Sequence, residues 1–233
     1  VTVSPVPDVE PGLIRLILTG PVLGVVLLQR GVRVYHAAVV ASPEDNAAYA
    51  VVARKGEGKS TIATALYNAG YSLMSDDLMV LATNDEQATV YPSFPSVKLR
   101  AASALVTVDD ASRLSQFAPG LDKRSLSIEE RFHRAPTKLR AVLVLRPGSS
   151  PSFCRLTGFD AIQALLPHWY GALFDGALLR IFGSRRHFND TVALAQGAEI
   201  YSFQRPWSLD RLDEMVHSVQ GAIGAGRLGI PRG

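Results

Sequence analysis

Short apolar runs separated by turn-forming residues dominate the first third of the chain. Apolar or β-branched segments lie at residues 13–18, 22–29, 33–40 and 49–53, with Gly, Pro and a Ser-Pro-Glu-Asp-Asn turn between them. Runs of this length and composition are typical of β-strands. The pattern therefore predicts a strand-rich beginning, in which residues 16–28 form two strands joined by a turn.

The apolar run at residues 16–28 also has to be weighed as a membrane segment. It falls short of the roughly 20 apolar residues that a spanning helix needs, and Gly20 and Pro21 interrupt it. The chain shows no signal-peptide pattern with a small-residue cleavage site. Its single cysteine, Cys154, allows no internal disulfide. We therefore expect a cytoplasmic protein that does not contact a membrane.

The spacing of apolar residues changes after residue 60. Ile62, Ala65, Leu66 and Ala69 recur at helical spacing, and Gly70 is suited to end that helix. Strand character returns at residues 71–81, and residues 139–147 form the clearest buried strand of the second half. We further predict helices at 101–118, 159–166, 168–175, 185–196 and 208–224, a strand at 198–203, and a mobile surface loop at 121–138.

The mixture of strands and helices predicts an α/β fold with a mixed β-sheet. The 233 residues contain 47% hydrophobic residues, enough for a sizeable core, and no linker rich in Gly or Pro divides them. We therefore predict one domain, 1–233, with a strand-rich part at 1–52, a central part at 53–81 and a substrate-side helical part at 82–233. The net charge of +3 is scattered, and basic residues do not interleave with aromatic ones, which argues against nucleic-acid binding.

Residues 53–60, ARKGEGKS, carry the strongest chemical signal. They follow the G-x-x-x-x-G-K-[ST] phosphate-loop pattern except that Ala53 replaces the first glycine, and they join a predicted strand to a predicted helix. Such a loop binds phosphate through backbone N–H groups and the positive end of the helix. The predicted nucleotide-binding residues are Lys55, Gly56, Glu57, Gly58, Lys59, Ser60 and Thr61. The alternative is a basic strand-to-helix turn without a ligand.

A pair of carboxylates, Asp76 and Asp77, follows on the next predicted strand. Parallel strands of such a unit end at the same edge of the sheet, so the pair is expected close to Lys59. Neighbouring residues of a strand point to opposite faces, so one carboxylate can hold magnesium while the other accepts a proton from an attacking hydroxyl. A solvated turn is the alternative, and the apolar flanks of the pair argue against it.

These motifs together resemble the catalytic domain of HPr kinase/phosphorylase, the bacterial serine kinase of the phosphotransferase system. That family has a histidine on a strand before the phosphate loop, the loop itself, and an Asp-Asp pair about one helix later. The matching positions are His36, Gly56, Gly58, Lys59, Ser60, Asp76 and Asp77. The resemblance implies a topology closer to phosphoenolpyruvate carboxykinase than to the Ras-like nucleotide hydrolases.

A weaker resemblance extends over residues 91–100, 135–147 and 201–212. Here the chain looks like the short HPr-kinase-like proteins of peptide-modification gene clusters, which include kinases of the C-terminal serine of lasso-peptide precursors. We expect the chain to differ from true HPr kinases, because the stretch before residue 30 is too short for their additional N-terminal domain and their later glycine-rich signature is not found in residues 1–233. The resemblance therefore favours a peptide or small-protein kinase, in a ring or a dimer.

The resemblance implies an ATP-dependent, Mg²⁺-dependent kinase that phosphorylates a serine of a peptide or small protein. In that reading Lys59 holds the outer phosphates, Ser60 and Asp77 bind the metal, and His36, Asp76 and Asp77 lie at the reacting group. Taken alone, a histidine on a strand such as His36 is more often a core residue. Cations that can contact phosphate or substrate are Lys98, Arg100, Lys123 and Arg124, and a solvated surface position is the alternative for each.

Other functions stay open at this point. One is an HPr-type protein serine kinase of phosphotransferase-system regulation. Another is a nucleotide-binding regulator without turnover, which would need metal and phosphate ligands but no additional carboxylate base. A third is a phosphate-loop kinase of a small metabolite.

Overall fold

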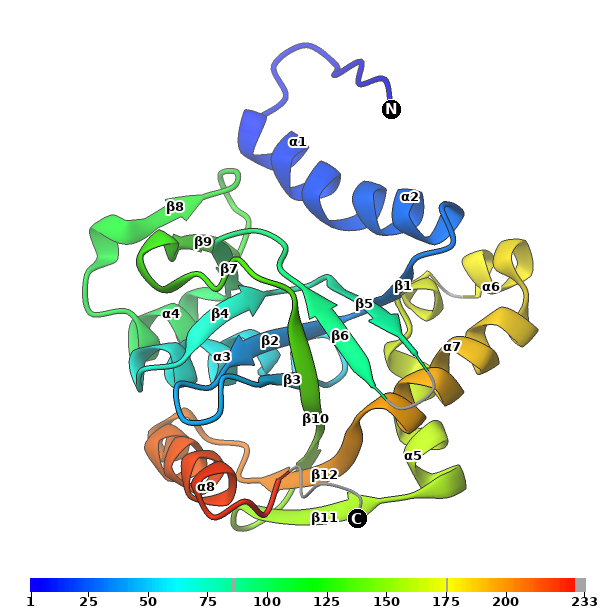
Figure 1. The fold of residues 1–233 in the computed structure, drawn as a ribbon. Coiled ribbons are helices and arrows are strands. Elements are labelled where there is room, and N and C mark those ends of the chain that lie inside the picture. Colours follow the sequence, from blue (N-terminus) through cyan, green and yellow to red (C-terminus); the bar gives the residue numbers. More distant parts are fainter. Residues whose placement is uncertain (85–86, 175, 229–233) are drawn as a thin grey trace.

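A mixed nine-stranded sheet forms the centre of the computed structural model, which describes residues 1–84, 87–174 and 176–228 (Figure 1). Its main path has the order β1-β5-β6-β10-β3-β2-β4, and β12 joins β10 to β11. The strands are β1 (Arg33–Tyr35), β2 (Ala37–Ala41), β3 (Ala48–Val52), β4 (Ser72–Ser75), β5 (Met79–Thr83), β6 (Ala88–Tyr91), β10 (Thr137–Pro147), β11 (Ser152–Leu156) and β12 (Glu199–Arg205). The predicted mixed α/β class is confirmed.

One edge of this sheet collects the ends of several strands. β10 pairs in parallel with β3 and with β12, while β2 pairs antiparallel with both β3 and β4. The carboxyl ends of β3, β4 and β12 therefore lie at the same edge, together with the amino end of β2. This edge brings together the loop after Val52, the residues after Ser75, Arg205 at the end of β12, and His36 just before β2.

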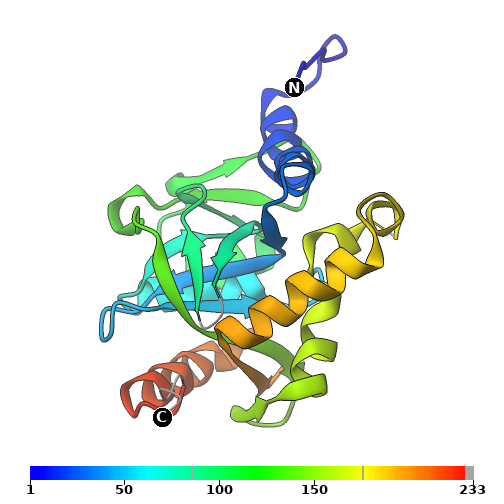
Figure 2. The same cartoon turned by 45° about the vertical axis from the view of Figure 1, so that its right-hand side comes forward.

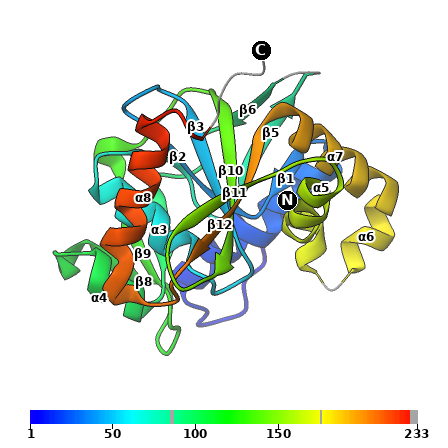
Figure 3. The ribbon, with the colours of Figure 1, turned by 90° about the horizontal axis from the view of Figure 1, so that it is seen from below.

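Helices cover both faces of the large sheet (Figure 3), and its central strands β2 and β3 are therefore buried on both sides. Apolar residues of α3 (Lys59–Asn68), α4 (Ala101–Thr107) and α8 (Leu212–Gly224) join one core cluster. Those of α5 (Gly158–Leu165), α6 (Ala177–Phe182) and α7 (Ser184–Gly197) join the other. The helices predicted at 159–166, 185–196 and 208–224 are thus confirmed, as are the strands at 139–147 and 198–203.

The helix predicted at 168–175 is wrong over residues 168–174, where short 3₁₀ turns take its place. Residue 175 lies outside the described residues. The 3₁₀ segments are η2 (Ala111–Arg113), η3 (Glu129–Arg131), η4 (Leu166–His168), η5 (Tyr170–Leu173) and η6 (Leu209–Arg211).

A second, three-stranded antiparallel sheet corrects two further predictions. It consists of β7 (Ser96–Leu99), β8 (Leu114–Gln116) and β9 (Arg124–Ser127), in the order β7-β9-β8. The helix predicted at 101–118 ends at Thr107, and the loop predicted at 121–138 contains β9. Leu126 of β9 is buried with Val97 of β7 in the core. The polar composition of this segment alone indicated a loop. Hydrogen bonding of β9 to β7 and burial of Leu126 stabilise a strand there instead.

The beginning of the chain is helical, so the two strands predicted within residues 16–28 are wrong. α1 (Pro11–Ile17), the π-helical segment η1 (Leu18–Val22) and α2 (Leu23–Gln29) form one continuous run, seen in blue in Figure 2. Pro21 lies inside η1. Proline has no backbone N–H to donate to the preceding turn, and the wider π-helical turn tolerates the missing hydrogen bond. The predicted turn is therefore a local widening of a helix.

This N-terminal helical run is apolar along most of its length. Pro11–Gln29 has 19 residues and a mean hydropathy of 1.9, and 17% of its most apolar window is buried. By length and composition alone, it is long and apolar enough to cross a membrane, as core helices and signal sequences also can be. The expectation that the chain does not contact a membrane stays a prediction.

Candidate active site

The phosphate-loop sequence forms the expected strand–turn–helix. β3 ends at Val52, and α3 begins at Lys59 with Gly58 as its N-cap. Gly56 and Gly58 have φ values of +88° and +87°, which non-glycine residues rarely adopt. Arginine side chains also press against the turn: a Cβ on Gly58 would lie 2.7 Å from Nη2 of Arg205. The first N–H groups of α3 have no partner within the helix and can bind an anion.

Lys59 and His36 form a direct contact below this loop. Nζ of Lys59 lies 2.9 Å from Nε2 of His36 and 3.4 Å from the carbonyl oxygen of Ala53. Nδ1 of His36 lies 3.1 Å from the carbonyl oxygen of Asp77 and 3.2 Å from its Oδ1. Both of these oxygens accept, so Nδ1 carries the hydrogen and Nε2 accepts from Lys59. Burial lowers the pKa of Lys59, and the two nearby carboxylates partly oppose that shift.

Asp76 faces the beginning of α3. Its Oδ1 accepts a hydrogen bond from Oγ of Ser60 at 2.8 Å, and its Oδ2 accepts one from the backbone N–H of Lys98, also at 2.8 Å. Burial raises the pKa of Asp76, and the charge of Asp77 raises it further, although the two hydrogen bonds act against this. A buried carboxylate bonded to the hydroxyl that follows the loop lysine is suited to hold a cation beside a phosphate.

Asp77 faces the other way. Its Oδ2 accepts from Nζ of Lys98 at 2.8 Å, while Oδ1 lies beside His36. Burial raises its pKa, but the hydrogen bond from His36 and the charge of Lys98 lower it by more, so the net shift is downward and Asp77 stays ionised. The pair was predicted to lie on a strand, yet β4 ends at Ser75, and Asp77 adopts φ +86° in the turn beyond it. The turn, rather than strand alternation, separates the two carboxylates.

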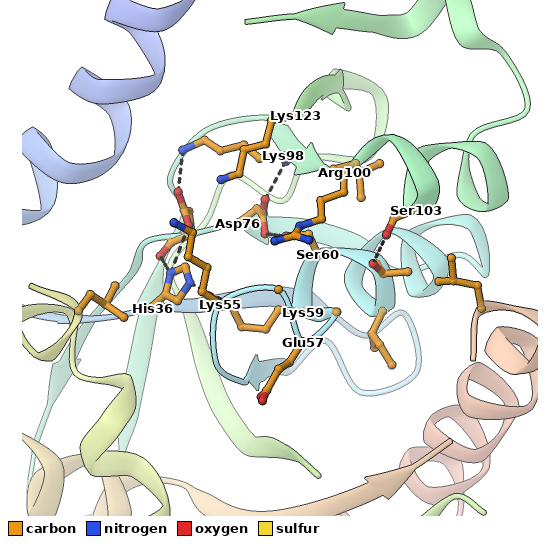
Figure 4. Close-up of a pocket in the computed structure, with 18 of the residues that line it drawn as sticks. His36, Lys55, Glu57, Lys59, Ser60, Asp76, Lys98, Arg100, Ser103 and Lys123 are labelled. Atoms are coloured by element: carbon orange, nitrogen blue, oxygen red, sulfur yellow. Dashed lines mark hydrogen bonds and ion pairs between the residues drawn. The ribbon is translucent and has the colours of Figure 1, made fainter. Parts of the chain in front are cut away.

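The four cations predicted to contact phosphate or substrate are divided by the structure. Lys98, Arg100 and Lys123 line the same cavity as the phosphate loop (Figure 4). A Cβ on Gly56 would lie 3.2 Å from Nη2 of Arg100. Arg124 donates through Nη1 to the carbonyl oxygens of Leu121 and Lys123 and does not line this cavity. The first three cations therefore lie around the cavity of the phosphate loop, and Arg124 does not.

Arg205 and Trp207 belong to the site although the sequence did not single them out. Arg205 is buried, donates through Nη2 to the carbonyl oxygen of Glu57, and stacks its guanidinium 4.7 Å from the ring centre of Trp207. Its Nε has no hydrogen-bond partner among the described residues. The available signal was an arginine just after the strand predicted at 198–203, but only the parallel β3-β10-β12 order places that strand beside the loop strand.

The cavity around these residues has a volume of about 620 Å³, a charged middle and two apolar ends. The middle holds the loop, the carboxylates and the cations, with His36 and Lys59 on one side of it (Figure 4). One apolar end is formed by Trp207, Leu209, Leu212 and Met215. The other is formed by Leu16, Ile17, Pro21, Tyr170, Leu173 and Phe174. The cavity thus combines a charged, polar centre with apolar surfaces suited to less polar groups.

Comparison with known proteins gives matches among solved structures, at low sequence identity. No family model matches the chain, and no curated protein matches it. Among solved structures, the chain is similar to the Hpr(Ser) kinase/phosphatase from Coxiella burnetii, with 10% identity and a TM-score of 0.46, over 84% of this chain and 99% of that chain. At this level of similarity, any function proposed for the chain has to rest on its own residues.

Proposed function

We propose that the chain is an ATP-dependent kinase that transfers the γ-phosphoryl group to a serine hydroxyl of a peptide or small protein. One observation carries the proposal: a single phosphate loop meets two differently paired carboxylates, Asp76 on Ser60 and Asp77 on His36. A site that only bound nucleotide would need the pairing of Asp76 with Ser60 but not that of Asp77 with His36. The second pairing holds an ionised carboxylate at the position where it can accept the proton of an attacking hydroxyl.

The loop and its cations account for nucleotide binding. Backbone N–H groups of residues 56–61 can cradle phosphate oxygens, and Lys59 can reach the outer phosphates by leaving its contact with His36. Arg100 stands over Gly56 on the open side of the loop. ATP suits this site because its charge matches the cluster of Lys and Arg side chains.

Ser60 and Asp76 fit a magnesium ion. Mg²⁺ is usually held by one or two protein oxygens together with substrate phosphates, and these side chains already lie 2.8 Å apart beside the loop. From the sequence we had assigned Ser60 and Asp77 to the metal. The contact of Asp76 with Ser60 leads us to propose Asp76 instead. Bound there, the ion would offset the negative charge of the phosphates.

Asp77 is the proposed acceptor for the proton of the serine hydroxyl. The contacts with His36 and Lys98 hold its carboxylate in place and keep it ionised. The backbone N–H of His36, in turn, donates a hydrogen bond to the carbonyl oxygen of His168, which fixes the position of this residue. The resemblance to the short HPr-kinase-like proteins implies the C-terminal serine of a lasso-peptide precursor as the acceptor.

The proposal is tested by separating ATP binding from phosphoryl transfer in Asp77→Asn. The protein is incubated with ATP, Mg²⁺ and a panel of serine peptides, and the products are weighed for added HPO₃. We expect near-normal ATP binding by calorimetry and a transfer rate lower by about 10²–10⁴-fold, the usual contribution of a general base. Slow ATP hydrolysis without any peptide gives a second readout.

Asp76→Asn is the companion variant, and we expect it to weaken binding of Mg²⁺-ATP as well as transfer. Full transfer activity in Asp77→Asn would contradict the mechanism. Tight ATP binding by the unaltered protein, with neither hydrolysis nor transfer, would support the nucleotide-binding regulator instead.

A further inference from the structure

The two apolar ends of the cavity can be assigned to different groups, and this step rests on the proposed function. In a phosphate loop the lysine reaches the β- and γ-phosphates, while the loop amides hold the inner ones. Nζ of Lys59 contacts His36, and His36 contacts Asp77. The γ-phosphoryl group therefore belongs at the end of the cavity formed by Tyr170 and the N-terminal helical run. The other end, near Met215, is left for the nucleoside.

The N-terminal helical run stands directly beside the proposed proton acceptor. A Cβ on Gly20 would lie 3.6 Å from Oδ2 of Asp77, 3.5 Å from Nζ of Lys98 and 4.0 Å from the hydroxyl of Tyr170. Gly24 packs so closely on the ring of Tyr170 that a Cβ would lie 2.1 Å from it. A hydroxyl that reaches Asp77 therefore approaches from the cavity that this helical run and η5 both line.

The surfaces that this helical run and η5 contribute to the cavity are apolar. Leu16, Ile17 and Pro21 come from the helical run, and Leu173 and Phe174 come from η5 and its end. Ile17 is 45% exposed and Leu173 is 40% exposed, so the wall is open to solvent in the chain by itself. Covering apolar area of this kind is favourable for a partner that brings apolar groups of its own.

We propose that this wall binds the residues next to the acceptor serine, so that the kinase selects a serine flanked by aliphatic or aromatic residues. The wall is continuous with the cavity and ends at Asp77, which places its occupant at the reacting hydroxyl. An extended peptide segment fits this geometry, because its serine can enter the cavity while a neighbouring side chain lies on Ile17 or Leu173. Pockets of this kind discriminate between side chains of different size by about 10- to 200-fold per methylene.

The test compares two sets of serine peptides of equal charge, one with Leu or Phe beside the serine and one with Gly or Asn. The unaltered full chain is expected to phosphorylate the apolar set with a kcat/KM at least about tenfold higher. Ile17→Ser and Leu173→Ser, on two different elements, should each reduce that preference by raising KM for the peptide. Ile181→Ser is the matched control, because Ile181 is 71% exposed and does not line the cavity.

Two outcomes would overturn the inference. Equal activity on both peptide sets, with transfer still dependent on Asp77, would refute the apolar wall and leave the proposed kinase standing. Flotation of the protein with phosphatidylcholine vesicles, lost in Ile17→Ser and accompanied by equal activity on both sets, would show that the wall contacts lipid instead. If the unaltered protein neither transfers phosphate to any peptide nor hydrolyses ATP, the proposed kinase function itself is refuted. Unchanged circular dichroism of each variant shows that it folds.

Discussion

Asp77 connects most of the charged groups of the site at the scale of single residues. Its carboxylate lies between His36 and Lys98, and the other ring nitrogen of His36 contacts Lys59. Each of these side chains is at least partly withdrawn from water, which makes their interactions stronger than those of surface pairs.

The lowered pKa of Asp77 predicts how stability depends on pH. A carboxyl whose folded pKa is below its unfolded value, about 3.9, contributes its full stabilisation above that value and loses it as the pH falls toward the folded pKa. Asp77→Asn should therefore lower the free energy of unfolding at pH 7 by about 1–3 kcal/mol, since Lys98 loses a charged partner.

Urea unfolding at pH 7, 5 and 3 checks this prediction. The difference between the unaltered protein and Asp77→Asn should shrink toward pH 3, because below about 3.9 the unfolded chain takes up a proton at Asp77 that the folded chain does not bind. Asp213→Asn serves as the control, because Asp213 is exposed and lies in the first turn of α8. A difference that stays constant from pH 7 to pH 3 would contradict the assigned ionisation of Asp77.

At the scale of elements, close glycine contacts and a buried leucine hold the N-terminal helical run to the rest of the molecule. Gly12 lies against the backbone of Phe117, Gly24 lies against the ring of Tyr170, and Leu28 of α2 is buried in the core. Gly20, between them, faces the site. The run is thereby fixed over one end of the cavity although much of its apolar surface is exposed.

Gly24→Ala is predicted to displace this run. The new Cβ would lie 2.1 Å from the Tyr170 ring, and overpacking of this kind typically costs about 1–3 kcal/mol. Gly221→Ala is the matched control, because Gly221 is also helical and a Cβ there meets nothing within 4 Å. The control should gain up to about 1 kcal/mol from helix propensity. Thermal unfolding of both variants measures the difference, and equal shifts would show that α2 is not packed on Tyr170.

At the scale of the whole molecule, the site depends on elements far apart in the sequence. The loop follows β3, while Arg205 ends β12, which reaches the loop only through the parallel order β3-β10-β12. Arg205 donates to the carbonyl oxygen of Glu57 and packs against Gly58. The last third of the chain therefore fixes the shape of a loop formed in the first third.

Removing this long-range contact should weaken nucleotide binding. Arg205→Ala frees the Glu57–Gly58 peptide to rotate, so we expect the Kd for Mg²⁺-ATP to rise by about tenfold, which corresponds to about 1.4 kcal/mol. Arg205→Lys should restore part of the affinity. Arg211→Ala is the control, because Arg211 is exposed and forms an ion pair with Glu214. Calorimetric titration with Mg²⁺-ATP decides the matter, and an unchanged Kd in Arg205→Ala would refute the role.

Local sequence determined the features that depend on neighbouring residues. The phosphate loop could be predicted because its glycines, lysine and serine act within one turn, and Gly56 and Gly58 indeed adopt the left-handed conformation. The buried strand at 139–147 and the helix at 185–196 could be predicted because their apolar spacing matches one type of element over many residues.

Tertiary structure decided the features that depend on distant partners. The run at 16–28 is apolar enough for either strand or helix, and its packing on Tyr170 accompanies the helical outcome. The polar segment around Leu126 is a strand because β7 pairs with it. Which aspartate faces Ser60, and the presence of Arg205 at the loop, follow from a turn and a strand order that no local pattern encodes. Residues adjacent in sequence fix backbone conformation, whereas only the folded chain brings separate charges within hydrogen-bonding distance.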